Sequence, residues 1–319
     1  MARMENMKRT NKKFSMVAAI LLLLAGGILL WYNEVRSAAT GDAISEARSA
    51  VVALPDVGRL DPSFNGKLVY ATGTPENKDA ITDPLIGVTV TGISLERRAE
   101  YYQWVERTAR ETRSTSSGGS EQVTVYNYVQ EWANSPVNSS SFHEYAYRND
   151  NTVLMRVPTE TIYADDVIFG AYKLPHFIID SIRSGSATIE MSPDAIENLN
   201  SQITRPGWGN YVHVQGNIVY LGRSPSSPNT GDVRVIYNEV KPAAISIMAT
   251  VAGDTFEPFR ASNGNTFSQV SMGTVAMDEM FGDAVRVNAR ITWVLRIVGV
   301  LLVGLGLLLF FRRRTASKA

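Results

Sequence analysis

Two apolar stretches near the ends of the chain constrain its fold more than any other feature. The first runs from Phe14 to Tyr32 and contains no charged residue. A helix of about nineteen residues rises about 29 Å, which matches the hydrocarbon core of a bilayer. The second runs from Ile291 to Phe311 and contains one charge, Arg296, near its start. We expect two transmembrane helices. Arg296 is interpreted as an interfacial anchor, with a functional charge inside the membrane as the alternative.

Basic residues flank both stretches on their outer sides. The orientation-setting residues are Lys8, Arg9, Lys12, Lys13, Arg312, Arg313 and Arg314. Because basic residues stay on the cytoplasmic side, both termini are predicted to be cytoplasmic and residues 33–290 to lie across the membrane.

A cleaved signal peptide is the competing interpretation of the first stretch. Residues 37–39 read Ser-Ala-Ala, which resembles a cleavage site, and a basic segment precedes the apolar run. The apolar run is longer than a normal signal core, and the charges of Glu34 and Arg36 crowd the site. We therefore predict an uncleaved anchor, and the central part is exported on either interpretation.

The charge of the exported part excludes some partners. The chain has 31 basic and 31 acidic residues, but nine of the basic ones and one acidic one lie in the terminal tails. The remaining 22 basic and 30 acidic residues give a net charge of about −8. Such a domain is not expected to bind nucleic acid or to bind anionic headgroups tightly. The absence of cysteine excludes disulfides, thiolate nucleophiles and zinc-thiolate sites.

The segment between the two spans is predicted to be a membrane-anchored α+β domain on helical stalks. Apolar residues at helical spacing continue past Tyr32 as far as Pro55 and recur before the second span. Short apolar alternations with turn residues fill the region between these stalks. The predicted parts are a tail (1–13), a span (14–32), a stalk (33–55), a β-rich domain (56–274), a stalk (275–290), a span (291–311) and a tail (312–319).

Within the β-rich domain, further strands and two short helices are expected. The helices are placed at 175–182 and from Pro193 to Asn200, where Ser192 is a good N-cap. Strands are placed at 67–72, 87–93, 142–148, 153–157, 210–214, 217–221, 232–240 and 244–251, with the last two pairing with each other.

A long aromatic hairpin is the most suggestive feature of this domain. Residues 94–106 fit a helical stripe, but residues 123–132 carry aromatics at even spacing, and the polar loop 114–120, with Gly118-Gly119 as a linker, separates the two segments. We therefore predict two paired extended arms with aromatics on one face. These rings could form a cross-strand core or a contact surface, because Tyr and Trp concentrate at interfaces. The candidate interface residues are Tyr102, Trp104, Tyr126, Tyr128 and Trp132.

The order of several short runs is similar to that of a known family. The runs are Asn33-Glu34-Val35-Arg36, Gly66-Lys67-Leu68-Val69-Tyr70, Asp83-Pro84 with Gly87-Val88, Tyr102-Gln103-Trp104-Val105-Glu106, Glu131-Trp132, Gly231-Asp232-Val233-Arg234-Val235 and residues 256–259. Together with the closing span, they resemble the LUMA, or transmembrane protein 43, family. The Tyr-Gln-Trp-Val-Glu run is the most specific of them.

This resemblance implies an integral membrane protein with a large non-cytosolic domain. Animal members are associated with the endoplasmic reticulum and inner nuclear membrane, are thought to organise membrane protein complexes, and are not known as enzymes. They carry further membrane segments after the second span, whereas this chain ends at Ala319. The short extracytoplasmic loops and the lack of cysteine suit a short bacterial inner-membrane member with a periplasmic domain.

Residues that could carry catalysis are scattered. His143, His176 and His213 stand singly, and the pairs Asp165-Asp166 and Asp278-Glu279 lack the spacing of a carboxylate dyad or metal site. There is no P-loop, dinucleotide fingerprint or Gly-x-Ser-x-Gly motif. We therefore predict no catalytic, cofactor-binding or metal site.

The expected function is a non-enzymatic membrane scaffold that self-associates and organises other membrane proteins through its exported domain. The alternative is a sensor domain that binds a glycan or peptide, and an envelope hydrolase is the weakest hypothesis. The expected partners are the lipid bilayer, further copies of the chain and other membrane proteins, with no nucleic acid.

Overall fold

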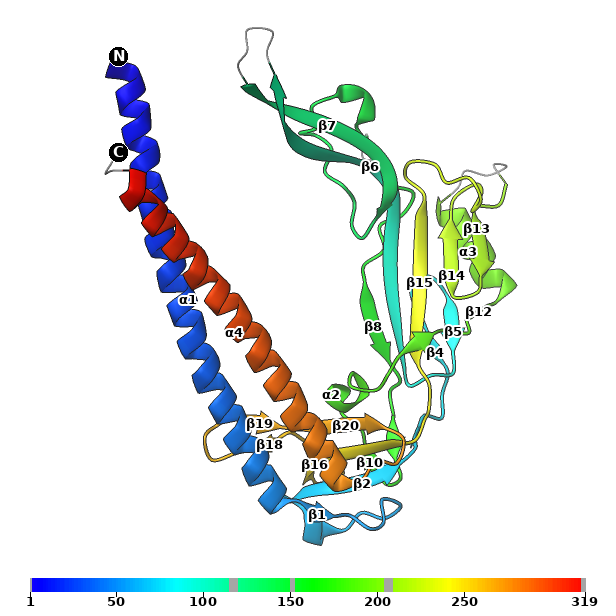
Figure 1. The fold of residues 1–319 in the computed structure, drawn as a ribbon. Helices are drawn as coiled ribbons and strands as arrows, with labels where there is room; N and C mark the ends of the chain where they lie inside the picture. Colours follow the sequence, from blue (N-terminus) through cyan, green and yellow to red (C-terminus); the bar gives the residue numbers. More distant parts are fainter. Residues whose placement is uncertain (1, 115–119, 150–152, 204–208, 317–319) are drawn as a thin grey trace. The chain divides into compact units, whose positions relative to one another are not determined.

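The computed structural model describes residues 2–114, 120–149, 153–203 and 209–316, and the chain forms two compact units (Figure 1). The first unit comprises Met1–Gly73 and Ile245–Ala319, and the second comprises Thr74–Ala244. The predicted domain 56–274 is therefore divided between the two units. The side chains of the seven orientation-setting residues lie outside the described part, as does most of the predicted polar loop, including Gly118-Gly119.

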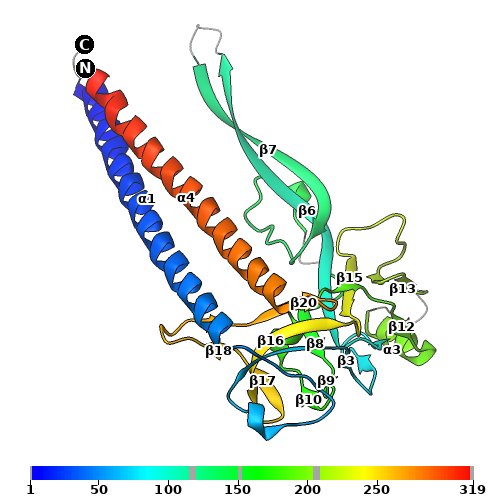
Figure 2. The ribbon, with the colours of Figure 1, turned by 60° about the horizontal axis from the view of Figure 1, so that its bottom comes forward.

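Two long helices dominate the first unit. Helix α1 (Ala2–Ala50) and helix α4 (Met277–Ala316) lie side by side, with the start of α1 and the end of α4 at the same end of the pair (Figures 1 and 2). Each contains a stretch long and apolar enough to cross a membrane. Helix α1 ends five residues before Pro55, because the next residues form strand β1 (Val52–Ala53).

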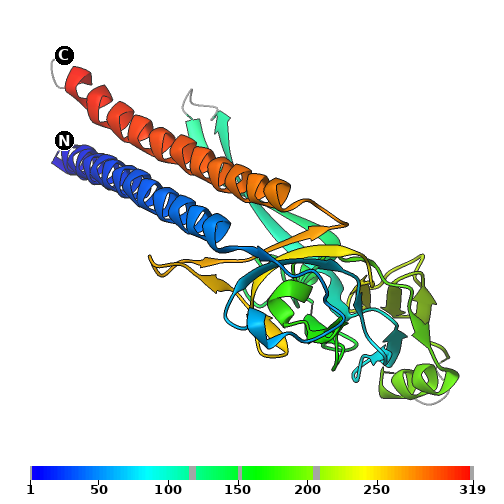
Figure 3. The same cartoon turned by 90° about the horizontal axis from the view of Figure 1, so that it is seen from below.

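A small sheet lies at the base of the helix pair (Figure 3). Its order is β1, β2 (Leu68–Gly73), β16 (Ile245–Ala252) and β17 (Thr255–Glu257), and β20 (Gln269–Met272) also pairs with β16. The prediction that 244–251 pairs with 232–240 was wrong, because β16 pairs with β2 and β20 in the other unit. A strand buried along almost its whole length needs neighbours on both edges, and β2 and β20 supply them.

The core of the first unit joins the helices to this sheet. It contains Ile44 and Ala47 of α1, Leu68 and Met248 of the sheet, and Phe281 of α4. A short hairpin of β18 (Phe259–Arg260) and β19 (Thr266–Phe267) lies beside α1, where Ser262 donates two hydrogen bonds to Glu46. The stalk segments are therefore fixed to folded structure at their base.

The second unit is built on a sheet of seven strands. Its order is β13 (Val212–Gln215), β14 (Ile218–Leu221), β15 (Val233–Val240), β6 (Ser94–Ser114) and β7 (Ser120–Ala133). Strands β8 (Glu160–Tyr163) and β11 (Gly185–Ser186) pair with β6 and β15. Residues of β15 alternate between buried and half-buried along most of its length, which is the pattern of a sheet with one face in a core.

A second layer covers the buried face of this sheet. It contains β4 (Ile81–Thr82), β5 (Val88–Val90), β12 (Glu190–Met191) and α3 (Pro193–Ile203). The Ser192 hydroxyl accepts a hydrogen bond from the backbone of Ala195, which confirms the predicted N-cap. The remaining elements of the unit are β3 (Pro75–Glu76), β9 (Ile168–Phe169), β10 (Tyr172–Lys173) and α2 (His176–Ile179).

Two predicted strands are absent from the described residues. Residues 142–148 form turns and one 3₁₀ turn (Tyr145–Tyr147), and residues 153–157 are irregular. Side chains, rather than a neighbouring strand, bind the first of these segments. The backbone amide of His143 donates to Glu106, and that of Asn149 donates to Ser139.

Candidate functional site: the long hairpin and the seam between the helices

The predicted hairpin is confirmed by the pairing of β6 with β7. The register places Tyr102 opposite Trp132, Trp104 opposite Gln130, and Glu106 opposite Tyr128. Helical propensity in residues 94–106 is overridden because the first eight residues of β6 also pair with β15 in the middle of the sheet.

All five candidate interface residues lie on one face of the hairpin, since side chains two apart on a strand share a face. Tyr102 contacts Trp132, with ring centroids 5.2 Å apart. Arg234 lies over the Trp132 ring at 4.4 Å. This end of the face is therefore engaged with the sheet itself.

The rest of the aromatic face is covered by the turn segment 142–149. Tyr147 stacks on Tyr128 at 4.3 Å and meets the edge of Trp104 at 4.8 Å. His143 stacks on Tyr126 at 4.2 Å. Four of the five candidate residues are half-buried, and only Tyr126 is exposed. Most of this face therefore serves packing within the chain.

Glu106 connects the turn segment 142–149 to the hairpin. Its carboxylate accepts a hydrogen bond from the Tyr128 hydroxyl at 2.6 Å and one from the His143 amide at 2.6 Å. These two donors lower the pKa of Glu106. The Tyr128 hydroxyl in turn accepts a hydrogen bond from the Glu144 amide.

Beyond Glu106 the hairpin is a ribbon of two strands. In the described part of the chain, residues 107–114 of β6 pair with β7 alone, and side chains on both faces are exposed or half-buried. An isolated two-stranded ribbon is marginally stable in water. This distal ribbon, residues 107–114 and 120–127, is therefore the part of the second unit that most needs a partner.

A buried ion pair fixes the root of the hairpin. Arg97 and Asp83 are almost fully buried, and Arg97 Nη1 lies 2.5 Å from Asp83 Oδ1. The Tyr237 hydroxyl donates to the other oxygen of Asp83 at 2.6 Å, and burial with this bond raises the pKa of Tyr237. Glu160 binds the opposite end of the guanidinium at 2.7 Å. The Asp83-Pro84 run is thus a structural anchor.

A second buried carboxylate explains the Gly231-Asp232 run. Asp232 accepts hydrogen bonds from the Tyr220 hydroxyl at 2.5 Å and the Asn229 amide at 2.8 Å. A Cβ on Gly222 would lie 2.5–2.7 Å from the Asp232 carboxyl atoms, so this position requires glycine. The Asp232 side chain therefore fixes the turn before β15.

Small residues at seven-residue spacing form the seam between the helices. On α1 the seam contains Ala19, Gly26, Asn33 and Ala47, and on α4 it contains Thr292, Gly299 and Gly306, all of them buried. A Cβ on Gly26 would lie 2.7 Å from Val303, and one on Gly299 would lie 2.7 Å from Leu30. Small residues allow such close approach of helices in lipid, and a seven-residue repeat is typical of a left-handed pair.

Polar side chains interrupt the seam where the first span is predicted to end. The buried Asn33 amide donates to the Thr292 carbonyl at 3.0 Å. Arg36 donates to the Asn288 side chain at 3.1 Å and to the Thr292 hydroxyl at 2.9 Å. Outside this seam, Arg296 forms a two-pronged contact with Glu34 at 2.7 and 2.8 Å. Sequence reasoning named Arg296 but missed these partners, which lie about 250 residues away along the chain.

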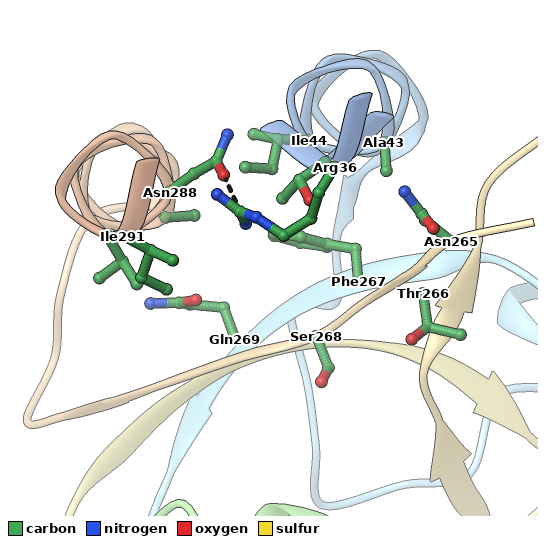
Figure 4. A pocket seen from close by; sticks show the side chains of 13 residues that line it. Arg36, Ala43, Ile44, Asn265, Thr266, Phe267, Ser268, Gln269, Asn288 and Ile291 are labelled. Carbon is green, nitrogen blue, oxygen red and sulfur yellow. Dashed lines mark hydrogen bonds between the residues drawn. The ribbon is translucent and has the colours of Figure 1, made fainter. Parts of the chain in front are cut away.

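A cavity of about 430 Å³ lies below this polar cluster (Figure 4). Its walls come from α1, from α4 and from residues 265–269 around β19. Arg36, Asn288 and Gln269 supply polar groups, while Ile44 and Phe267 supply apolar surface. Among the residues lining it there is no carboxylate. The cavity is thus cationic on one side and apolar on the other.

The single histidines have structural contacts. His143 and His176 stack on tyrosine rings, the latter on Tyr163 at 3.8 Å, and the His213 ring lies 6.1 Å from that of Tyr220. In the described part of the chain, no group of three or more His, Asp or Glu side chains could hold a metal ion.

Two helices long and apolar enough to cross a membrane flank the β-rich part in the sequence, which is the layout of a membrane-anchored protein with two candidate spans. The sequence profile of transmembrane protein 43 matches residues 101–316, from the hairpin root to the end of α4. The chain therefore belongs to the transmembrane protein 43 family, as the order of short runs indicated.

Similar proteins agree with this assignment. Transmembrane protein 43 of Mus musculus is 28% identical over 308 residues, covering 93% of this chain and 73% of the relative. The Homo sapiens protein is 27% identical over 308 residues, with the same coverage of both chains. The Drosophila melanogaster homolog is 25% identical over 293 residues. No solved structure matches the chain.

Proposed function

We propose that this protein is a non-enzymatic membrane scaffold that self-associates through the distal ribbon of its hairpin. The observation that carries the proposal is the ribbon itself, whose strands have no other pairing partner among the described residues. Unpaired strand edges are templates for a further strand, and strand addition is a recurring mode of recognition.

The charges on the ribbon favour a second copy as that partner. Within the distal ribbon, strand β6 carries three arginines and one glutamate, whereas β7 carries one glutamate, Glu121, and no basic residue. The β7 edge of one copy therefore complements the β6 edge of the next. Such a head-to-tail contact forms a ring if the rotation closes and a filament if it does not.

The alternative, a sensor that stacks a glycan or peptide on the aromatic hairpin, has weaker support. The rings of Trp104 and Tyr128 already contact Tyr147 of the same chain, so a ligand would have to displace the turn segment 142–149. We further propose that both termini are cytoplasmic, because basic residues flank both spans on their outer sides in the sequence. The membrane is proposed to be the bacterial inner membrane, with a periplasmic head, which the lack of cysteine suits.

Charge reversal on β6 tests the self-association. The full chain in mild detergent is expected to form an oligomer by light scattering after size separation. Arg110→Glu with Arg113→Glu should shift it to monomer, because β6 would then repel β7 of the neighbouring copy. The matched control, Lys78→Glu with Arg183→Glu, makes the same charge change at exposed positions elsewhere in the second unit. A monomeric wild type, or an oligomer unaffected by the β6 reversal, would exclude the proposal.

A further inference from the structure

We propose that the cavity at the base of the helix pair binds the phosphate of an anionic phospholipid from the surrounding bilayer, with Arg36 as its principal ligand. This inference concerns the first unit only and is independent of self-association through the hairpin.

The position of the cavity matches the depth of lipid headgroups. Arg36 follows the predicted end of the first span, Tyr32, by four residues, or about 6 Å along the helix. Ile44, at the far wall, lies about 18 Å beyond Tyr32. Ile291, the first residue of the predicted second span, also lines the cavity. The end of the cavity at Arg36 and Ile291 is therefore at the depth expected for lipid headgroups.

Arg36 is suited to bind an anion, because it is a cation with a hydrogen-bond donor that no other described group uses. Its two terminal nitrogens bind neutral groups, Asn288 and Thr292, and among the described residues it has no carboxylate partner. The Arg36 Nε is buried and has no hydrogen-bond partner within that same part of the chain. Arginine at this depth is favoured where it meets phosphate, because its planar donors match phosphate oxygens.

The remaining walls suit the rest of a lipid. Thr40, Asn265 and Gln269 offer hydroxyl and amide groups to a glycerol or other polar headgroup. Towards the predicted span, the apolar side chains of Ile291, which lines the cavity, and Val294, about one turn further along α4, are exposed and offer a surface for acyl chains. A cavity of about 430 Å³ also lies within the usual range of small-molecule sites, about 300–1,000 Å³.

The net acidic charge of the exported part does not oppose this local site. Exposed charges are screened beyond about 8 Å at physiological ionic strength. Of the acidic residues of α1 near the cavity, Glu34 binds Arg296 and Glu46 binds Ser262, while Asp42 is exposed and does not line the cavity. A lipid that diffuses within the bilayer also needs no long-range attraction to reach the cavity.

Native mass spectrometry of the full chain tests the proposal. The detergent-solubilised, delipidated protein is mixed with equal amounts of phosphatidylglycerol, phosphatidylcholine and phosphate-free diacylglycerol. We expect one phosphatidylglycerol retained per chain, in clear excess over the other two. Arg36→Gln should weaken this retention about tenfold, the usual effect of losing a charged hydrogen bond. Arg296→Gln is the matched control, because it removes an arginine at a similar depth outside the cavity.

A second variant separates lipid loss from misfolding. Val287 lines the cavity and is half exposed, so Val287→Trp should fill the space while leaving the hydrogen bonds of Arg36 intact. It should also abolish retention of the lipid. Equal retention of all three lipids, or unchanged retention in both Arg36→Gln and Val287→Trp, would overturn the proposal. Binding of inorganic phosphate as tight as that of phosphatidylglycerol would show a soluble anion as the ligand instead.

Discussion

At the scale of single residues, buried charges decide the geometry of the second unit. Arg97 and Asp83 satisfy each other together with Tyr237 and Glu160, and so a strand, a turn and the hairpin root are held in one arrangement. A buried charge that loses its partner is strongly destabilising, whereas an exposed pair contributes little. Substitutions at neighbouring positions of the same strand are therefore expected to change the stability of the protein by very different amounts.

We expect Arg97→Met to destabilise the second unit by about 3–5 kcal/mol, because Asp83 would remain buried without a counter-charge. Urea unfolding of the full chain, followed by tryptophan fluorescence, measures this. Arg98→Gln, at a side chain that is 46% exposed, should change stability by less than about 0.5 kcal/mol. Equal effects of the two changes would contradict the assigned role of Arg97.

The hydrogen bonds of Glu106 predict that the packing of the turn segment 142–149 over the hairpin depends on pH. Its pKa is lowered from 4.5 by hydrogen bonds from Tyr128 and His143, so the folded state favours the carboxylate. The contribution is therefore complete above about pH 4.5 and is lost as the pH falls through the lower folded pKa. The hydrogen-exchange protection factors of the 142–149 amides, which correct for the intrinsic pH dependence of exchange, should fall below pH 4. Glu106→Gln should remove most of this pH dependence of protection, while Glu111→Gln, on the distal ribbon, should retain it.

At the scale of elements, the helix pair depends on close backbone approach rather than on large apolar contacts. Lipid provides no hydrophobic drive between apolar helices, so packing of small residues and hydrogen bonds between helices supply the association. The glycines of the seam allow the close packing, and Asn33 and Arg36 supply the hydrogen bonds between the helices. The hairpin β6–β7 shows the opposite strategy, since large aromatic rings fill its covered face.

Gly299→Val should push the two helices apart, because even a Cβ at this position would lie 2.7 Å from Leu30. Gly304→Val is the control, since a Cβ there meets nothing within 4 Å. Energy transfer between dyes at positions 10 and 317 in nanodiscs would report the separation. A lower transfer efficiency is expected only for the first variant, and an identical efficiency in both would exclude the glycine seam as the contact.

At the scale of the whole molecule, the arrangement of α1 and α4 sets the topology. The start of α1 and the end of α4 lie at one end of the pair (Figure 2), so we expect both tails to share one side of the membrane. The base of the helices, with its sheet, is at the other end. Which side of the membrane the tails occupy stays a prediction from the basic clusters.

The cysteine-free sequence allows a direct test of that topology. Single substitutions Thr10→Cys and Ser317→Cys should be labelled by a membrane-impermeant maleimide only after the membrane is permeabilised. Asp56→Cys, at an exposed position beyond the helix base, should be labelled in intact cells. Labelling of positions 10 and 317 on opposite sides would contradict the hairpin arrangement of the spans.

The sequence by itself determined the spans, the α+β class, the family and the long hairpin, because these depend on local features: an uncharged apolar run and side-chain alternation along a strand. Only the tertiary structure decided that β16 joins β2, that Tyr147 covers the aromatic face, and that Arg36 meets Asn288 and Thr292. These contacts join residues between about 20 and 250 positions apart, and no local pattern encodes such a partner. The cavity at the helix base exists for the same reason, since its walls come from three separate segments that only folding brings together.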